Sequence, residues 1–483
     1  MVNMQDRYPF PELPKTKIVC TLGPSTNNPT ILTQMIESGM NVARLNMSHG
    51  DLVTHKSYVD MVRDISNNLS IPVGLMVDVP GAKYRTGSLK SGGITLKEGN
   101  SFVLSSDIFV GNNERVSIIP SGFHKDADVG RTVLVDDGNI ELEVLSVKSN
   151  DVTCKVVRGG RLTKGRGVVT PGKSPSQVFP DDKAVECLNF ASSVDADFVA
   201  LSNVIDADNI KTARDILKNN NGHNPIIISK IERSEAIDNI ASIVEETDAI
   251  MVARGDMGVE LPLNRVPIIQ KDLIRRSNEV GKPVITATQM LESMITSPSP
   301  TRAEVTDVAN AVYDGSDAVM LSAETSIGQY PLEAVRVMAN VALEAEKALP
   351  YQFMMNTRHK QLESEVDDAV SFAASQTSNT LDASLIIAFT ETGVAAGRVS
   401  RYRPKAKILA LTPSQKVQNL LTLYWGVFPL VVSKVEDVDD LFTIGEQEAR
   451  NILNRDPHMV ILVAGTPIGV PGTTNMLRIL NLN

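Results

Sequence analysis

Eight short runs of apolar, largely β-branched residues recur along this chain, and each is followed by polar residues. The runs are 16–25, 41–50, 73–81, 197–203, 225–232, 248–256, 283–290 and 317–325. Apart from one long gap they begin about 23–35 residues apart, which is the length of one strand–helix unit. Little polar alternation within a run indicates a strand buried on both faces, and therefore a parallel sheet. Eight such units predict a closed (β/α)8 barrel, with a doubly wound open sheet as the alternative.

The long gap in this series has a different character. Its short alternating runs, such as ERVSIIP at 114–120, are separated by Gly, Asn and Asp turns, which is typical of a small all-β domain. Because this segment is inserted after the third barrel strand, we expect it to lie over the carboxyl-terminal mouth of the barrel as a lid.

A third pattern follows a long helical stretch at roughly 331–381. Four further strand-like runs, at 384–390, 406–412, 427–433 and 458–465, alternate with helical segments and predict a compact α/β domain. The predicted domains are a catalytic barrel from 1–85 and 186–345, an inserted β lid from 86–185, and a C-terminal α/β effector and oligomerisation domain from 346–483.

Composition excludes several classes of partner. The formal net charge of −10 argues against a nucleic-acid or anionic membrane surface, and no run reaches the ~18 apolar residues of a membrane span. Cys20, Cys154 and Cys187 are far apart, so they form neither a disulfide framework nor a CxxC metal site. A reduced, cytoplasmic location is expected, because the amino terminus also lacks the apolar core of a secretory signal.

Charged and polar residues gather at the carboxyl ends of the predicted strands, where the active sites of such barrels lie. They include Arg44, Asp78, Lys230, Glu232 and Asp256. Cations and carboxylates together, without a cysteine cluster, suit a phosphoryl anion bridged by a divalent metal. Because unpaired buried charges are costly, a ring of charges in one barrel predicts a functional site.

Chemical roles follow from the residue types. Glu232 and Asp256 offer hard oxygen ligands for Mg²⁺, and Lys230 and Arg44 would neutralise charge on phosphoryl oxygens. Thr288 would position or donate a proton.

Plainer interpretations remain open for individual residues. An Arg–Asp pair such as Arg254 with Asp256 is often only a surface salt bridge. Lys230 alone could be a solvated loop residue, and His49 a structural histidine. Gly255 lacks a Cβ, which would let the backbone approach a ligand closely.

Several blocks of the sequence resemble the signature sequences of pyruvate kinases. They are TKIVCTLGPS (16–25), NVARLNMSHG (41–50), IMVARGDMGVE (250–260) and the long block at 283–334. The resemblance covers nearly the whole chain. It implies transfer of the phosphoryl group of phosphoenolpyruvate to ADP, giving pyruvate and ATP, with Mg²⁺ or Mn²⁺ as cofactor.

The resemblance also implies roles for individual residues. Those implied for catalysis are Lys230, Thr288 and Arg44. Phosphoenolpyruvate would be bound by the same three residues with Arg254, Gly255 and Asp256. The nucleotide would be bound by Asn46, His49, Arg85 and Arg166. Mg²⁺ would be held by Glu232 and Asp256, and a monovalent cation by Asn46, Ser48, Asp78 and Val79.

The chain departs from the family pattern at five positions. Lys83 stands where K⁺-dependent members carry glutamate and K⁺-independent members carry lysine. Because its ammonium can supply the charge of K⁺, we expect a weak K⁺ requirement or none. Arg166 and Val169 replace lysine and asparagine in the segment that returns from the lid, so nucleotide contacts are expected to differ. Asn203 and Ile205 follow the fourth strand where an aromatic and a cation are usual.

The C-terminal domain carries a candidate effector loop. Thr390, Thr392 and Gly393 resemble a phosphate-cradling loop before a helix, although an ordinary turn fits equally well. The loop at 466–471 has no basic residue, which favours a sugar monophosphate or nucleotide effector, or none, over a sugar bisphosphate. The resemblance further implies a homotetramer.

Two other functions stay open at this point. One is a catalytically weak paralogue that acts as a phospho-ligand-binding regulator, which the departures motivate. The other is a different barrel enzyme acting on phosphoenolpyruvate or pyruvate, such as an aldolase or mutase.

Overall fold

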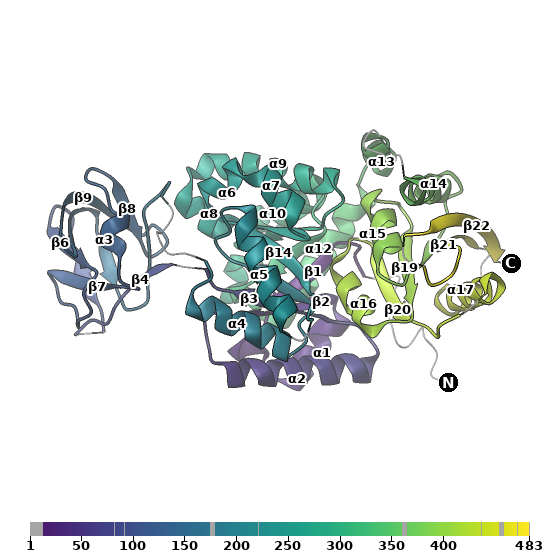
Figure 1. Cartoon of the computed structure of the whole chain (residues 1–483), viewed down its shortest axis with the longest axis horizontal. Coiled ribbons are helices and arrows are strands. Elements are labelled where there is room, and N and C mark those ends of the chain that lie inside the picture. Colours follow the sequence, from purple (N-terminus) through teal and green to yellow (C-terminus); the bar gives the residue numbers. More distant parts are fainter. Residues whose placement is uncertain are drawn as a thin grey trace.

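The computed structural model describes residues 13–482, apart from short gaps at 82, 91, 174–178, 221, 360–364, 436, 454–457 and 471. Within these residues the chain forms three bodies in a row: a small β unit, a central barrel and a C-terminal α/β unit (Figure 1).

The central body is a closed barrel of eight parallel strands, which confirms the predicted fold class and excludes the open sheet. The strands are β1 (Lys17–Thr21), β2 (Met40–Asn46), β3 (Gly74–Val79), β13 (Phe198–Leu201), β14 (Ile226–Ile231), β15 (Ala249–Ala253), β16 (Val284–Ala287) and β17 (Ala318–Leu321). Each overlaps one predicted run. Their hydrogen-bonded order is β1-β17-β16-β15-β14-β13-β3-β2, and β2 pairs again with β1.

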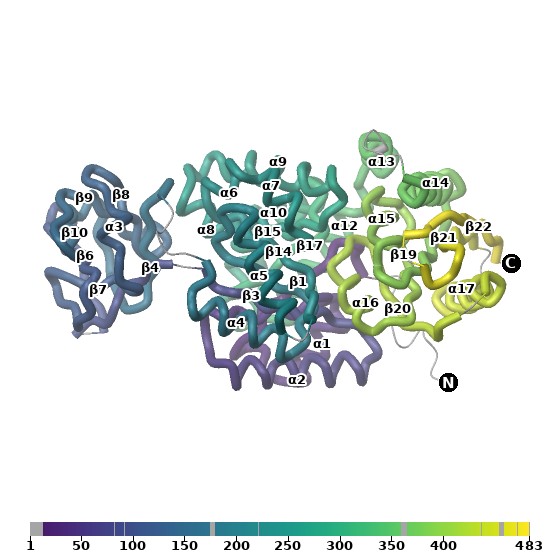
Figure 2. Tube along the Cα trace, viewed as in Figure 1, coloured from purple at the N-terminus to yellow at the C-terminus, as the bar shows by residue number. Residues whose placement is uncertain are grey.

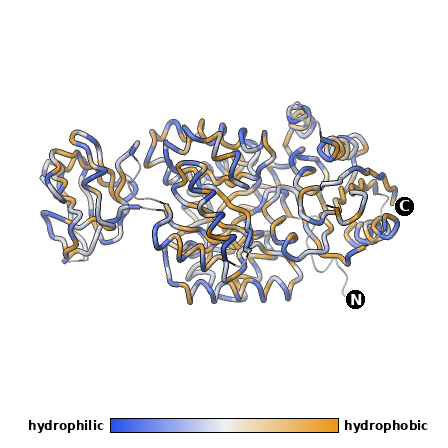
Figure 3. The backbone as a smooth tube through the Cα atoms, viewed as in Figure 1, coloured by the Kyte–Doolittle hydropathy of each residue, from blue (hydrophilic) through white to orange (hydrophobic). Residues whose placement is uncertain are grey.

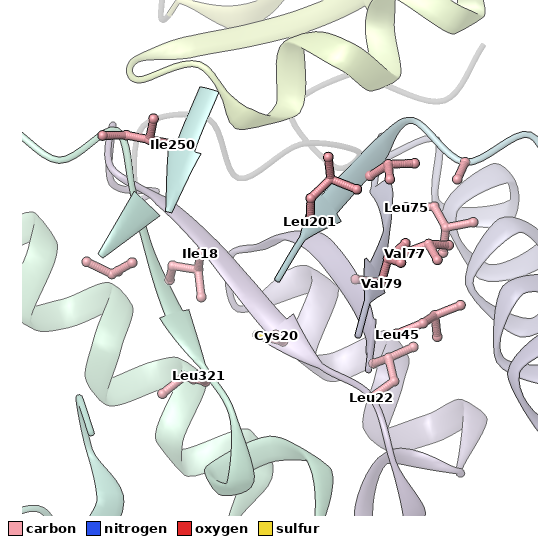
Figure 4. Packing of buried hydrophobic residues seen from close by; sticks show 14 of the residues in the cluster. Ile18, Cys20, Leu22, Leu45, Leu75, Val77, Val79, Leu201, Ile250 and Leu321 are labelled. Atoms are coloured by element: carbon pink, nitrogen blue, oxygen red, sulfur yellow. The ribbon is translucent and has the colours of Figure 1, made fainter. Parts of the chain in front are cut away.

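Two hydrophobic clusters explain why these strands show so little polar alternation. In β1, Val19 belongs to the cluster inside the barrel, whereas Ile18 and Cys20 belong to the cluster shared with helix residues such as Met35. Figure 4 shows part of this outer cluster. Because both faces are covered, every residue of β1, β3 and β15 is buried.

Helices surround the barrel. They are α1 (Pro29–Glu37), α2 (Leu52–Leu69), α4 (Asp182–Ser193), α5 (Ala207–Asn219), α6 (Ser234–Asp238), α7 (Ile240–Glu246), α8 (Arg254–Glu260), α9 (Val266–Glu279), α10 (Arg302–Asp314), α11 (Ala323–Ser326) and α12 (Pro331–Lys347). Short 3₁₀ helices are η2 (Pro24–Thr26), η3 (Leu263–Arg265) and η4 (Glu292–Ile295). Hydrophobic and hydrophilic positions alternate along the outer helices (Figure 3), as amphipathic packing requires.

Side-chain caps determine where several helices begin. Asp51, Asp181 and Asp206 precede α2, α4 and α5, and each carboxylate accepts a backbone N–H from the first turn. The chain breaks at Asn239 between α6 and α7.

The inserted unit is a second closed barrel with its own core. Its strands are β4 (Tyr84–Thr86), β6 (Ser101–Ser105), β7 (Arg115–Ile119), β8 (Thr132–Val135), β9 (Ile140–Lys148), β10 (Asp151–Arg158) and β12 (Gly167–Val169), in the order β10-β6-β7-β4-β12-β8-β9. A small two-stranded sheet, β5 (Ile94–Leu96) with β11 (Gly160–Leu162), and a helix, α3 (Phe123–Asp126), accompany it. We call this unit the lid.

The lid stands at one end of the barrel (Figure 2). This is the end where the barrel strands finish, because Lys83, next to the lid, pairs with Asp256, which follows β15. Its first strand, β4, begins at Tyr84, and α4 of the barrel begins at Asp182. β4 spans the predicted boundary at 85/86, and α4 spans the predicted boundary at 185/186. The domain boundaries stay a prediction.

The C-terminal unit is a five-stranded sheet covered by helices. The strands, β18 (Leu385–Phe389), β19 (Lys407–Thr412), β20 (Val427–Val431), β21 (His458–Gly465) and β22 (Thr474–Leu482), lie in the order β20-β19-β18-β21-β22. The helices are α13 (Tyr351–His359), α14 (Val366–Thr380), α15 (Val394–Arg401), α16 (Gln415–Leu420), η5 (Leu421–Leu423) and α17 (Val438–Ile452). The four predicted strands are present, while β22, which pairs antiparallel with β21, was not predicted.

The amino end of the barrel packs against this C-terminal unit. Lys17, at the start of β1, donates from Nζ to the carbonyl of Val427 at 2.6 Å. Arg403 donates to Asp317 at 2.7 Å, and Trp425 is buried in the same seam. None of the helices among the described residues combines the length and apolar character needed to cross a bilayer.

Candidate functional site

A cavity of about 920 Å³ opens at the carboxyl ends of β2, β3, β13, β14 and β15. Eight of the predicted site residues line it: Arg44, Asn46, Ser48, His49, Arg85, Lys230, Glu232 and Asp256. Lys83, Lys183, Ser202 and Asn203 line it as well. The barrel thus brings together residues that are up to about 210 positions apart in the sequence.

Lys230 forms the centre of a buried network in this cavity. Its Nζ lies 3.2 Å from Oδ1 of Asp78 and 3.0 Å from Oε1 of Glu232, and it donates to Oγ of Ser202 at 2.7 Å. Arg44 donates from Nε to the other oxygen of Asp78 at 2.7 Å. Because β2 and β3 pair with Asn46 opposite Asp78, neighbouring strands deliver these groups to one point.

Charge balance in the network explains the direction of each pKa. Burial by itself would lower the pKa of Lys230, but Asp78 and Glu232 outweigh it and raise the pKa. Burial by itself would raise the pKa of Asp78. The charges of Lys230 and Arg44 together have the larger effect, so the pKa of Asp78 is lowered. Lys230 is therefore an ammonium held beside carboxylates, which can exchange those partners for a phosphoryl oxygen.

Glu232 and Asp256 fit a divalent metal. Burial is the main cause that raises the pKa of Glu232, and the nearby charge of Asp256 raises it further. Oε2 of Glu232 accepts the N–H of Asn203 at 2.8 Å, while Oε1 has no second partner beyond Lys230 among the described residues. Two neighbouring carboxylates facing one cavity match the one or two protein ligands that Mg²⁺ takes.

Lys83 occupies the side of this cavity nearest the lid. Its Nζ donates to Oδ1 of Asp256 at 2.7 Å. Burial opposes the charged form of Lys83, but Asp256 and then Glu232 raise its pKa overall. Burial by itself would raise the pKa of Asp256, but the charges of Lys83 and Lys230 outweigh this effect and lower it.

His49 lies among cations. Burial, then Arg85 and Arg44, lower its pKa. A neutral imidazole at the cavity wall could accept or donate a hydrogen bond to a ligand without adding charge.

Family comparisons agree with this architecture along nearly the whole chain. The family model described as the barrel domain of pyruvate kinase matches residues 13–335, and the model described as its alpha/beta domain matches residues 368–480. The chain belongs to the pyruvate kinase family.

Curated pyruvate kinases from several bacteria are similar over most of their length. That of Staphylococcus saprophyticus subsp. saprophyticus is 43% identical over 470 residues, which cover 96% of this chain and 80% of the relative. That of Staphylococcus haemolyticus is 41% identical with the same coverage. That of Sporosarcina psychrophila is 40% identical over 468 residues, again covering 96% and 80%. This chain is therefore an enzyme of the phosphotransferase class, and pyruvate kinases generally depend on a divalent metal.

Other residues that the pyruvate kinase resemblance implicates lie outside the cavity lining. Arg254 turns away from it: Nη1 pairs with Asp307 on α10 at 2.7 Å, and Nη2 donates to the carbonyl of Thr288 at 2.7 Å. Thr288 has a φ of 68° and its Oγ1 accepts the N–H of Gly255 at 2.7 Å. Arg254 thus holds the loop that carries Thr288 against Gly255 of α8.

The predicted monovalent-cation residues are only partly available. Oδ1 of Asn46 accepts the N–H of Ser48 at 3.2 Å, and Asp78 is fully engaged by Arg44 and Lys230. Val79 is buried. In this arrangement Lys83 and Lys230 already supply cationic charge to the cavity.

Arg166 lies on the lid and does not line the cavity. Its Nη1 pairs with Asp136 at 3.0 Å and its Nε donates to Thr163 at 2.7 Å. Val169 lines a smaller cleft between lid and barrel. Any contact of Arg166 with a nucleotide would therefore require the side chain to leave these partners.

Two residues of the network were not predicted. Ser202, after β13, bonds both Lys230 and Asp78, and Thr21, at the end of β1, accepts from Arg44 at 2.8 Å. Their position at strand ends was the available signal, but serine and threonine are too common there to stand out.

The candidate effector loop borders a second cavity, of about 670 Å³. Thr390 and Thr392 line it, and Oγ1 of Thr390 accepts the N–H of Gly393 at 2.9 Å. Gly393 has a φ of 92°, which suits glycine at the start of α15. Among the described lining residues the charged ones are Glu391 and Lys434.

Proposed function

We propose that this chain transfers the phosphoryl group of phosphoenolpyruvate to ADP at the cavity of Lys230. The bond between phosphorus and the enol oxygen breaks, and a bond to a β-phosphate oxygen of ADP forms. The enolate then takes a proton at its methylene carbon and becomes pyruvate. The observation that supports this most directly is the ammonium of Lys230, buried between Asp78 and Glu232 and facing the cavity.

Lys230 and Arg44 would stabilise the group in transfer. Charge in this transition state spreads over the three equatorial phosphoryl oxygens, and pre-positioned cations lower its energy. Asp78 holds both cations in place before substrate arrives. Since the cations are already oriented, little reorganisation is needed during the reaction.

Glu232 and Asp256 would hold the divalent cation, Mg²⁺ or Mn²⁺. When bound, the ion would supply positive charge that offsets the negative charge of the phosphate oxygens. Thr288 and Gly255, which the Arg254 contacts hold together, would lie beside the enolpyruvate portion of the substrate. Asn46, His49, Arg85 and Arg166 would serve the nucleotide.

Several finer points belong to the same proposal. Lys83 replaces the charge of K⁺, so no K⁺ is required. The loop of Thr390, Thr392 and Gly393 binds a sugar monophosphate or nucleotide effector. The active form is a cytoplasmic homotetramer, and the C-terminal unit contributes to its assembly.

The test is turnover of phosphoenolpyruvate and ADP with saturating Mg²⁺, with all products identified. ATP and pyruvate are expected, with kcat lowered roughly a thousandfold in Lys230→Met because a transition-state cation is lost. Binding of phospho-ligands without turnover would instead support the regulatory paralogue, which no comparison favours. A different product would point to another barrel enzyme.

A further inference from the structure

Both connections between barrel and lid are held from the short helix α8. The outgoing connection carries Lys83, which donates to Asp256 at 2.7 Å. The returning connection carries Gly172, whose N–H donates to Oε2 of Glu260 at 3.3 Å. Asp256 and Glu260 are four residues apart, so they project from the same face of α8. One helix therefore contacts both segments that connect the lid to the barrel.

A buried ion pair completes the contact with the returning connection. Arg233, which follows β14, lies with Nη2 3.1 Å from Oε1 of Glu260, and both side chains are only 5–6% exposed. The same nitrogen donates to the carbonyl of Lys173 at 2.7 Å. Burying such a pair carries a desolvation penalty that apolar residues would avoid.

The acidic and the basic side chain of this ion pair each bond a backbone group of the matching kind in the returning connection. The carboxylate of Glu260 meets the N–H of Gly172, and the guanidinium of Arg233 meets the carbonyl of Lys173. The side chain of Lys173 turns instead to Asp128 within the lid, at 2.9 Å. Lys173 is thus the junction residue, fixed to the lid by its side chain and to the barrel by its carbonyl.

We propose that Arg233 and Glu260 are positioning residues that clamp the returning connection and so fix the orientation of the lid over the cavity. Neither residue lines that cavity. The catalytic consequence rests on the proposed function, because a displaced lid would misplace the nucleotide. The clamp itself does not rest on that function, because the orientation of the lid can be measured without substrate.

The experiment is a distance measurement between lid and barrel by pulsed electron paramagnetic resonance on the full chain. Spin labels are attached through Ile108→Cys on the lid and Val53→Cys on α2, since both positions are 80% exposed. The native Cys20, Cys154 and Cys187 are buried and will label slowly. Glu260→Gln and Arg233→Met are each expected to broaden the distance distribution and to shift it. A distribution identical to that of the parent in both variants would overturn the clamp.

A charge-reversed variant separates the clamp from a purely structural ion pair. Glu260→Arg with Arg233→Glu restores opposite charges, but it places a guanidinium against the N–H of Gly172 and a carboxylate against the carbonyl of Lys173. We expect the melting temperature to recover relative to Glu260→Gln while the distance distribution stays broad. Recovery of the parent distribution would show that only the ion pair matters and would overturn the proposal.

Asp128→Asn is the matched control. It removes an exposed ion pair of the same junction residue, but one that lies within the lid, so the parent distribution is expected.

In steady-state assays Glu260→Gln should lower kcat/KM for ADP by on the order of a hundredfold through misplacement of the nucleotide, with a smaller change for phosphoenolpyruvate. An equal loss for both substrates, alongside a parent distribution, would again contradict the clamp. A chain inactive in every form would overturn the proposed function while leaving the distance result to decide the clamp.

Discussion

The two ends of the barrel carry the same kinds of charged residue and use them differently. At the amino end, three aspartates each precede a strand, accept the N–H of a neighbouring strand, and pair with an arginine. The pairs are Asp197 with Arg63, Asp248 with Arg214, and Asp317 with Arg403, and the N–H groups belong to Leu75, Ile227 and Val284. Each carboxylate is therefore satisfied by a cation and by backbone.

At the carboxyl end the charged groups bond chiefly to one another and face a cavity. Lys230 contacts two carboxylates and a hydroxyl, and Lys83 contacts a third carboxylate. Such a network can exchange partners when an anion or a metal arrives, and in Glu232 the available oxygen is Oε1, because Oε2 accepts the N–H of Asn203. At the amino end, by contrast, release of a carboxylate would leave a strand N–H without its acceptor. Charge at a strand end is thus no sign of chemistry until its partners are known.

The largest effect is expected at the amino end, in stability. Arg403→Met leaves the buried Asp317 without its cation, which should lower the free energy of unfolding by about 3–5 kcal/mol. Urea unfolding followed by the fluorescence of Trp425, the only tryptophan, measures this free energy. Trp425 lies where the barrel packs against the C-terminal unit. Activity per folded molecule should not change.

The control for that variant is Arg450→Met on α17, where a half-exposed pair with Glu446 should contribute below about 1 kcal/mol. If Arg403→Met instead abolished turnover at unchanged stability, the division of roles between the two ends would fail.

The next effect concerns the carboxyl end. Glu232→Gln removes a proposed metal ligand, so Mg²⁺ affinity measured by titration calorimetry should fall at least about tenfold, or ~1.4 kcal/mol. Asp248→Asn, at the opposite end, should leave the affinity unchanged. Equal affinities in the parent and Glu232→Gln would remove Glu232 from the metal site.

A third prediction sharpens the description of the amino end through pH. Burial, then the charge of Lys407, lowers the pKa of Lys17 to about 7 from its usual 10.5. Between these values the unfolded chain binds more protons than the folded chain, so stability should rise with pH from about 7 to about 10.5. Burial likewise lowers the pKa of Lys15 and of Lys407 to about 8.

Lys17→Met should flatten this slope in thermal melts at pH 7, 8 and 9. Glu346, whose carboxylate accepts the N–H groups of Lys15 and Thr16, is unaltered in that variant, so its contribution cancels between the two chains. A slope of the same steepness in the variant would exclude Lys17 as its source.

The smallest effect is expected from K⁺. Activity of the parent with Mg²⁺ should be nearly the same in K⁺ and in a tetramethylammonium salt of equal ionic strength. Lys83→Glu should lose activity without K⁺ and recover some of it when K⁺ is added, because the charge at the cavity is then supplied by the ion. A parent chain that needs K⁺ would refute the role of Lys83.

Much of the fold was predictable because the signal is local. Buried parallel strands such as β15 read as uninterrupted apolar runs, and their spacing revealed the barrel. The edge strand β22 escaped, because its sequence TNMLRILNL mixes exposed and buried positions without regular alternation. The break at Asn239 between α6 and α7 also has no strong local signal.

The site was predictable in its membership and less so in its geometry. Strand-end positions identified Lys230 and Glu232, but the direction of Arg254 depends on Asp307, which lies 53 residues away on α10. Ser202 was missed for a related reason, since only the packed barrel shows that its hydroxyl meets Lys230. Partners distant in sequence decide which strand-end charges remain available.

The position of the lid between β3 and β13 has a consequence for synthesis on the ribosome. β1 bonds to β17, and Thr21 donates to the carbonyl of Leu321, 300 residues further along. The barrel therefore cannot close until β17, which ends at Leu321, has been translated. The lid, whose core lies within residues 84–168, needs no later residue and can fold while the first three barrel strands wait. Those nascent strands present open sheet edges during that interval, and it is then that a chaperone would have most to protect.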